Sequence, residues 1–404
     1  MYAFSNKYKK RVYFFCFYLK ESYFYRMISK LPNVETSIFA VMSKMAADNN
    51  ALNLSQGFPN FKSDPLLIEM VNKAMIGGFN QYAPMPGDLG LREVISEKTK
   101  LLHQKIYNPD TEITVTAGAT QAIFTAIAAI INKGDEAIIF TPAYDCYKPS
   151  IELFGGKTIP VQLKAPFYQV DWTEVEDKIT TNTKLIIINS PHNPSGTILF
   201  ENDMIQLQDF VTKYNLLVIS DEVYEHIIFD GQTHFSAARF PELASKSFII
   251  ASFGKTFHNT GWKMGYCLAP ENLMTEFKKV HQFNVFSVNT PMQKALAEYL
   301  KTPDHYLSLP KFYQQKRDVF LDLIKDSRFK IIPSKGTYFQ MLDFSEISQE
   351  SDIIFTERLT KVNKIAMIPT SVFNTNKEDF KQIRVCFAKT EVTLQEAALI
   401  LNAI

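Results

Sequence analysis

Five short runs of apolar residues, rich in isoleucine, leucine and valine, recur through the middle of the chain and constrain its fold most strongly. They cover residues 113–117, 137–140, 185–189, 216–220 and 248–252. The first run is followed by Gly118 and by residues 119–132, whose apolar spacing is helical and which end before Gly134. Continuous apolar strands separated by helices are typical of a mostly parallel sheet with both faces covered. The sequence therefore predicts an α/β fold.

The ends of these predicted strands carry the residues of greatest chemical interest. In sheets of this kind, ligands bind beyond the carboxyl ends of the strands. The residues that the sequence places at such ends are Gly118, Asn193, Asp221, Ser252 and Lys255. We therefore expect one functional site along this edge of the sheet.

The region after about residue 290 has a different pattern. It begins with a predicted helix at 291–300, continues with an extended segment at 335–344, and ends with the apolar segment 383–389 and an amphipathic helix. This order predicts a second, smaller α+β domain made of residues 27–60 and 290–404. Residues 61–289 would then form the large domain.

Residues 1–26 contain an apolar run, 12–19, that follows several basic residues. A signal peptide is one interpretation, although no A-x-A-like cleavage site follows the run. A transmembrane helix needs about 20 apolar residues, which is far more than this run offers. We expect an upstream, misassigned start, with functional sequence beginning at Met27 and residues 1–26 extraneous to function.

Composition excludes several classes of function. The net charge is +1, from 43 basic and 42 acidic residues, which predicts neither nucleic-acid binding nor attraction to an anionic membrane. The four cysteines form no CxxC pair, which favours a reducing, cytoplasmic compartment over a disulfide scaffold. The seven histidines show no paired spacing, so we expect no metal site.

Lys255 lies in the segment SFGKTFHNTGWKMGY, residues 252–266, directly after a predicted buried strand. It can be an ordinary surface lysine or a Schiff-base lysine whose amine is made reactive by desolvation and neighbouring cations. Ser252 and Lys263 flank it and could bind a phosphate. The charge of Lys263 would favour the neutral amine of Lys255.

Asp221 follows four apolar residues in the segment SDEVY, so we expect its carboxylate to be buried. A buried carboxylate must be paired or hydrogen-bonded. It can serve as a helix N-cap or as the partner of a protonated pyridine nitrogen in a cofactor. Tyr224, three residues further on, could reach the phenolic oxygen of such a ring or be an ordinary half-buried tyrosine.

Three further motifs are weaker when taken singly. Asn193 lies in SPHNPSG, which is typical of a turn but also offers an amide donor at a strand end. Residues 118–120 open a helix after a strand, where backbone N–H groups can bind an anion. Arg384 lies between apolar residues and is either part of a buried ion pair or a bidentate carboxylate receptor.

Taken together and in this order, the motifs GAT, NPSG, DEVY, SFGKT with GWK, and the late arginine resemble the fold type I pyridoxal-phosphate aminotransferases of class I. The resemblance covers the chain from about residue 32 to its end. Within that class, the segments LSQGFPNF, SFGKTFHNTGWKMGY and VHQFNVFSVNTP are most similar to bacterial methionine aminotransferases and to the kynurenine and glutamine K aminotransferases.

The resemblance implies a mostly parallel, seven-stranded large domain, a smaller domain that closes on substrate, and pyridoxal 5'-phosphate as cofactor. It implies that Lys255 holds the cofactor and moves a proton, that Asp221 binds the pyridinium, and that Tyr224 with Asn193 binds the phenolic oxygen. The remaining implied roles are phosphate binding by Gly118, Ala119, Thr120, Ser252 and Lys263, ring stacking by Tyr144, and substrate-carboxylate binding by Gly57, Asn193 and Arg384. Tyr82 would reach the phosphate in a partner subunit, which implies a homodimer.

The resemblance also bears on the substrate. Aspartate aminotransferases read the distal carboxylate with an arginine from the partner subunit, whereas residues 284–291 contain no arginine and offer Phe286. We expect apolar or aromatic donors, with methionine first, and a ping-pong transfer to a 2-oxo acid. A C–S β-lyase acting on cysteine conjugates is the alternative on the same fold. A transcription regulator is disfavoured because residues 1–50 are too short for a winged DNA-binding module.

Overall fold

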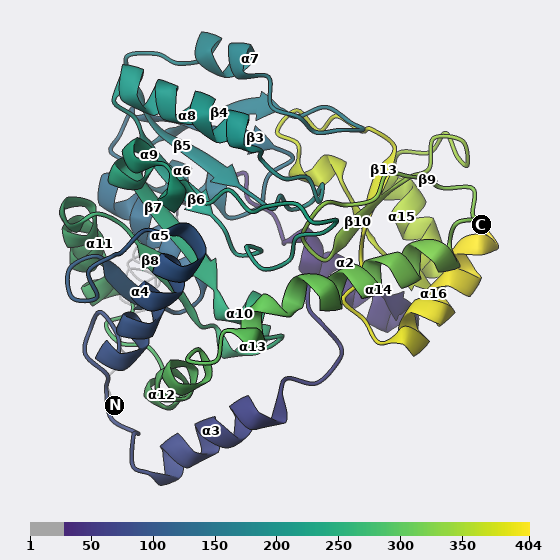
Figure 1. The fold of residues 1–404 in the computed structure, drawn as a ribbon. Helices are drawn as coiled ribbons and strands as arrows, with labels where there is room; N and C mark the ends of the chain where they lie inside the picture. Colours follow the sequence, from purple (N-terminus) through teal and green to yellow (C-terminus); the bar gives the residue numbers. More distant parts are fainter. Residues whose placement is uncertain (1–27) are drawn as a thin grey trace, which may run out of the picture. The chain divides into compact units, whose positions relative to one another are not determined.

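The computed structural model describes residues 28–404 (Figure 1). The predicted N-terminal extension, residues 1–26, lies outside the described residues. The chain divides into two units, residues 1–35 and residues 36–404. Residues 28–35 hold no helix or strand, and every element named below belongs to the second unit.

The largest sheet of this unit has seven strands and is mostly parallel, as the sequence analysis expects. Strand β8 runs antiparallel to both of its neighbours, β2 and β7, and the other neighbouring pairs are parallel. The order across the sheet is β2 (Ile113–Thr116), β8 (Gly265–Leu268), β7 (Ser247–Ser252), β6 (Leu217–Asp221), β5 (Thr183–Asn189), β3 (Glu136–Thr141) and β4 (Lys157–Gln162).

Helices cover both faces of this sheet because successive side chains of each strand point to opposite sides. Ile139 and Ile187 pack with α5 (Ala119–Ile130), α6 (Tyr147–Leu153) and α11 (Glu271–Asn284). Ile138 and Ile186 share the opposite core with α4 (Leu89–His103), α8 (Glu201–Tyr214), α9 (Pro241–Lys246) and α12 (Thr290–Tyr299). Helix α3 (Pro65–Ile76) packs on α12.

Two smaller sheets contribute to separate hydrophobic cores, and their strands β9, β10 and β13 lie on the right of Figure 1. One has the order β12 (Ile368–Pro369), β13 (Gln382–Cys386), β10 (Phe339–Asp343) and β9 (Lys330–Ile331), with antiparallel neighbours. The other pairs β1 (Leu52–Asn53) in parallel with β11 (Ile365–Ala366). The surrounding helices are α2 (Ile38–Asp48), α14 (Leu309–Leu323), α15 (Asp352–Lys361) and α16 (Glu391–Asn402).

The division of the chain into a large and a small domain stays a prediction. Strand β1 pairs with β11, so an early segment does join the late region. Helix α12, in contrast, packs against α3 and α4, and its Leu296 belongs to the core under the seven-stranded sheet. From the sequence, this helix is predicted to begin the smaller domain instead.

The remaining elements are short, and one of them carries a residue of chemical interest. Helix α10 (Phe253–Thr256) follows β7 and holds Lys255. The others are α7 (Trp172–Asp177), α13 (Asp304–Leu307) and the 3-10 helices η1 (Ala237–Arg239), η2 (Thr260–Trp262) and η3 (Ser371–Phe373). Among residues 28–404, no helix combines the length and apolar character that a membrane crossing requires.

Candidate active site

A cavity of about 270 Å³ lies where the carboxyl ends of β5, β6 and β7 meet segments of the smaller sheets. Asn189 and Asp221, the last residues of β5 and β6, are paired in the sheet register. Most of the predicted site residues line this cavity: Gly57, Gly118, Ala119, Thr120, Tyr144, Asn193, Asp221, Tyr224, Ser252, Lys255, Lys263 and Arg384. The structure therefore brings together residues that are up to about 330 positions apart, as between Ser55 and Arg384.

Lys255 projects from α10, whose N-cap, Ser252, accepts a hydrogen bond from the backbone N–H of Lys255 at 3.4 Å. The Lys255 Nζ donates to the Gly57 carbonyl oxygen at 3.2 Å and to Tyr338 Oη at 3.0 Å. Neither partner carries a charge. Burial of the amine lowers its pKa to about 8, and the positive charges of Arg384 and Lys263 act in the same direction. These surroundings favour a reactive amine over a surface lysine.

Asp221 is buried, with 3% of its surface exposed. Its carboxylate accepts a hydrogen bond from Tyr147 Oη at 2.5 Å and a longer one from the Val223 N–H at 3.4 Å. Burial raises the pKa of Asp221 to about 6, against the opposing effect of the Tyr147 hydrogen bond. The alternative role as a helix N-cap is wrong, because no helix begins after β6 at this point. A carboxylate in this position suits a cationic partner in the cavity.

The N-terminus of α5 carries several of the residues predicted to bind a phosphate. Its N-cap residue, Gly118, has φ 79°, and no side chain caps the helix. A Cβ on Gly118 would lie 3.4 Å from Lys263 Nζ, so that ammonium is close to the helix end. The hydroxyl oxygens of Thr120 and Tyr144 are 3.3 Å apart. Uncapped N–H groups, a helix dipole and a nearby lysine suit a phosphate-like group, as the sequence predicts for this helix end.

Arg384 lies on β13 and is buried, with 1% of its surface exposed. Its guanidinium donates to Asn193 Oδ1 at 2.7 Å and to the Ser55 carbonyl oxygen at 3.0 Å, and lies 3.9 Å from the centre of the Phe339 ring. Its Nε has no partner among the described residues. Burial lowers the pKa of Arg384 to about 10. Because both hydrogen-bond partners are neutral, the guanidinium resembles a receptor awaiting a carboxylate more than half of an ion pair.

Tyr224 is buried beside this group, and its ring meets that of Tyr338 edge-on, with centroids 5.2 Å apart. Burial raises the pKa of Tyr224, so its hydroxyl keeps its proton and can act as a donor. Tyr144 meets Tyr147 at 5.8 Å, also edge-on.

Several residues of this site have no role in the sequence analysis. Tyr147 donates a hydrogen bond to Asp221 and follows Tyr144, a predicted site residue, by three positions. Asn189 donates to the Asp221 carbonyl oxygen at 2.9 Å and accepts from the Asn193 N–H at 2.8 Å, so it fixes the loop after β5. Phe39 and Phe339 line the cavity from distant parts of the chain, and no local pattern marks either of them.

Two predicted site residues do not line this cavity. Tyr82 and Phe286 contact each other edge-on, with ring centroids 5.4 Å apart, and are 82% and 44% exposed. Their predicted action in a neighbouring subunit stays a prediction.

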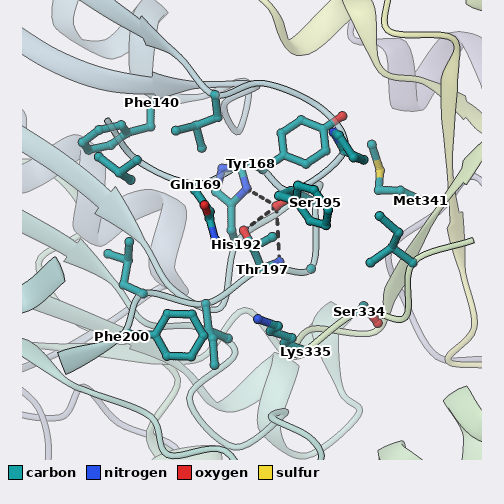
Figure 2. Close-up of a pocket in the computed structure, with 18 of the residues that line it drawn as sticks. Phe140, Tyr168, Gln169, His192, Ser195, Thr197, Phe200, Ser334, Lys335 and Met341 are labelled. Atoms are coloured by element: carbon teal, nitrogen blue, oxygen red, sulfur yellow. Dashed lines mark hydrogen bonds between the residues drawn. The ribbon is translucent and has the colours of Figure 1, made fainter. Parts of the chain in front are cut away.

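A second and larger cavity, of about 810 Å³, is lined in part by the loop after β5 (Figure 2). His192 Nδ1 lies 2.7 Å from Ser195 Oγ, which lies 2.8 Å from Thr197 Oγ1. Burial lowers the pKa of His192 to about 4. No carboxylate among the described residues orients this imidazole, so the group does not form a nucleophilic triad. None of the predicted site residues lines this larger cavity, so the smaller cavity is the candidate active site.

The seven-stranded sheet and the cavity at its carboxyl edge define a fold type I transferase. The family "Aminotransferase class I and II" matches residues 49–401, and the chain belongs to this family. It is an enzyme that transfers amino groups.

Named relatives agree with this assignment. The chain is 47% identical to the methionine aminotransferase of Escherichia coli (strain K12), over 92% of this chain and 96% of that protein. It is 34% identical to kynurenine–oxoglutarate transaminase 3 of Homo sapiens, over 93% and 89% of the two chains. A crystal structure from Escherichia coli, described as identifying a methionine aminotransferase function, superimposes with a TM-score of 0.92 at 46% identity and covers 93% of this chain and 99% of its own.

Proposed function

We propose that this enzyme transfers the amino group of an apolar or aromatic L-amino acid, methionine first, to a 2-oxo acid in a ping-pong cycle with pyridoxal 5'-phosphate. One observation carries the proposal. Lys255, Asp221 and Arg384 line one cavity, and their hydrogen-bond partners among the described residues are all neutral. Such a set is complementary to a ligand that brings an aldehyde, a cationic ring nitrogen and a carboxylate.

The residues present fit the cofactor. Lys255 would hold it covalently, Asp221 would bind its ring nitrogen, and Tyr224 with Asn193 would bind its phenolic oxygen. Its phosphate would occupy the uncapped N-terminus of α5, with Lys263 and Ser252 nearby. Tyr144 would lie against the ring. When bound, the cofactor withdraws electrons from the amino acid Cα, which acidifies the Cα proton.

The chain's own residues then perform three tasks. Arg384, with Asn193 and the backbone of Gly57, would hold the substrate carboxylate and fix the orientation of the Cα–H bond. The Lys255 amine would accept the proton that leaves the substrate Cα. A pKa of about 8 suits this exchange, because an efficient general base titrates near the working pH.

The cavity wall supports an apolar side chain on the substrate. Phe39, Ile123, Tyr144 and Phe339 line it, and its cations are Lys255, Lys263 and Arg384, each of which the cofactor or the α-carboxylate would engage. A second substrate carboxylate would be buried without a partner, which is costly. The similarity to a named methionine aminotransferase supports methionine as the first donor to test.

A homodimer and a cytoplasmic location complete the proposal. In the dimer, Tyr82 and Phe286 would reach the neighbouring site, in keeping with their exposure on this chain. The cysteines of the described part of the chain, Cys146, Cys267 and Cys386, are free, which supports a reducing compartment.

The test is the visible absorbance of the purified enzyme after addition of pyridoxal 5'-phosphate. We expect a band that methionine alone abolishes and a 2-oxo acid restores, and no such cycle in Lys255→Ala. A band that aspartate abolishes far better than methionine would refute the substrate assignment. Release of pyruvate and a thiol from a cysteine conjugate, without a 2-oxo acid and faster than transamination, would favour the β-lyase. Absence of any band would refute the role of Lys255.

A further inference from the structure

The Lys255 amine has two hydrogen-bond acceptors, and both lie on the same side of it. They are the Gly57 carbonyl oxygen at 3.2 Å and Tyr338 Oη at 3.0 Å. A neutral primary amine has two N–H bonds and one lone pair. If both N–H bonds point to these acceptors, the lone pair is left free for the cavity that Lys255 lines.

Tyr338 is arranged to accept from this amine. Its own hydroxyl donates to the Gly57 carbonyl oxygen at 2.7 Å, so its one proton is already engaged. Burial keeps the pKa of Tyr338 well above its ordinary value, and the hydroxyl therefore stays protonated. The only role left to its oxygen toward Lys255 is that of acceptor.

The Tyr338 ring is held firmly in place. It is fully buried, and it packs edge-on against Tyr224 at 5.2 Å and at a tilt against Tyr313 at 5.9 Å. Tyr338 is absent from the lining of the cavity, so it approaches Lys255 from the protein side.

We propose that Tyr338 is a positioning residue for the catalytic amine: with the Gly57 carbonyl it binds both N–H bonds of free Lys255 and directs the lone pair into the cavity. This inference deepens the proposed function and rests on it. It assigns the Tyr338 hydroxyl a part in both phases in which Lys255 is free, namely loading of the cofactor and movement of the Cα proton.

The test compares Tyr338→Phe with Tyr313→Phe. Tyr313 is the matched control, because it is buried in the same aromatic cluster and its hydroxyl is bonded to His258 Nδ1 at 2.7 Å instead of Lys255. The first readout is the pH dependence of Lys255 acetylation by trace acetic anhydride in the cofactor-free enzyme, followed by mass spectrometry of the Lys255 peptide. The second is kcat and KM for methionine.

We expect the acetylation midpoint near pH 8 in wild type and Tyr313→Phe. In Tyr338→Phe it should fall by about half a pH unit or more, because the ammonium form loses an acceptor. The kcat should fall about tenfold or more with KM changed less than about twofold, since a misdirected base slows proton transfer and leaves binding intact.

An unshifted midpoint in Tyr338→Phe, or equal shifts in both variants, would overturn the inference and leave Tyr338 a packing residue. An unchanged kcat would overturn it as well. Failure of the proposed function is distinguishable: the wild-type enzyme would then show no cofactor band. The acetylation midpoint, which tests the role of Tyr338, is measured without cofactor.

Discussion

Asp221 and Arg384 are buried ionisable residues whose partners among the described residues are neutral. A buried charge without an opposite charge costs free energy of folding. The apoenzyme therefore carries an energetic cost that cofactor and substrate would relieve, because each ligand supplies the missing opposite charge. Ligand binding and stability should consequently be strongly coupled at this site.

Replacement of Asp221 by Asn should stabilise the cofactor-free enzyme. The folded-state pKa of Asp221 is about 6, above the ordinary value of 3.8, so folding favours the protonated carboxyl. The cost therefore grows as pH rises from about 4 to about 6 and is constant above that range. Asp221→Asn should gain on the order of 1–3 kcal/mol at pH 7.5 and progressively less toward pH 4.5.

Urea unfolding of the apoenzyme at both pH values measures this gain. Asp209→Asn, on the exposed face of α8, is the control and should change stability little at either pH. An Asp221→Asn enzyme that is less stable than wild type at every pH would show that the carboxylate is satisfied without a ligand.

Replacement of Arg384 by Lys should impair substrate binding and spare the cofactor. A lysine loses the planar fork that can bind a carboxylate with two bonds, and it leaves Asn193 Oδ1 and the Ser55 carbonyl without their donor. We expect kcat/KM for methionine to fall about 100-fold or more, which corresponds to about 3 kcal/mol. The absorbance band of the bound cofactor should be unchanged.

Titration of that band with methionine separates the two effects. Arg358→Lys is the control, because Arg358 forms a partly exposed ion pair with Glu350 at 2.8 Å, and kcat/KM should stay within about twofold of wild type. A loss of the cofactor band in Arg384→Lys would indicate a role in cofactor binding instead.

Single site residues can be predicted from the sequence where a charged residue directly follows an apolar strand. Asp221 ends one apolar strand and Lys255 follows another, so both can be recognised in the sequence alone. Phe39 and Phe339 cannot be predicted in this way, because their position against Arg384 depends on packing between distant segments. Tyr147 lies three residues after the predicted Tyr144, but only the fold shows that its hydroxyl reaches Asp221.

Among the elements, helix α5 begins at the glycine where the sequence predicts anion binding. Gly118 ends the connection from β2 with φ 79°, a backbone conformation that favours glycine, and it leaves the first N–H groups of α5 uncapped. Lys263 approaches the same point from the segment after η2. The helix N-terminus and the lysine, which are far apart in sequence, would therefore act on the same anion in the proposed site.

Gly118→Ala should weaken cofactor binding at this helix N-terminus. The alanine Cβ would lie 3.4 Å from Lys263 Nζ, and its backbone would be strained at positive φ. We expect a loss of about 1 kcal/mol in stability and about a tenfold rise in the dissociation constant of pyridoxal 5'-phosphate. Equilibrium titration of apoenzyme fluorescence measures the second quantity.

Gly134→Ala provides the matched control. Gly134 also has positive φ, 94°, but a Cβ there would meet nothing within 4 Å. It should lose similar stability with an unchanged dissociation constant. Equal weakening of cofactor binding in both variants would show that the effect is one of stability alone.

The five predicted strands correspond to β2, β3, β5, β6 and β7, because strands buried on both faces are continuous apolar runs. Strand β4 is not predicted by this pattern, because it forms the sheet edge, is only half-buried and contains Pro160. Strand β8 is fully buried, but its short segment begins with Gly265 inside the lysine motif and lacks a β-branched run.

At the scale of the whole molecule, apolar side chains exposed in residues 28–404 bear on the proposed homodimer. Ile76 and Phe283 are 88% and 87% exposed, and Tyr82 and Phe286 contact each other at the surface. The Tyr82–Phe286 contact joins the segments 76–82 and 283–286, and adjoining exposed apolar groups are typical of a protein interface. The proposed homodimer would cover them and would deliver Tyr82 to the neighbouring phosphate site.

Mixing two variants, each expected to be inactive, tests directly whether Tyr82 acts in the neighbouring subunit's site. In a hybrid of Lys255→Ala and Tyr82→Ala, one site has both defects and the other has none, provided that Tyr82 acts across the interface. Random re-association makes half of the dimers hybrid, so activity should recover to about a quarter of wild type.

Lys255→Ala mixed with Asp221→Asn is the control. Both of these residues line the cavity of one chain, so every hybrid site keeps one defect and no recovery is expected. If the Tyr82→Ala mixture behaves like this control while both variants dimerise, Tyr82 does not act in the neighbouring site.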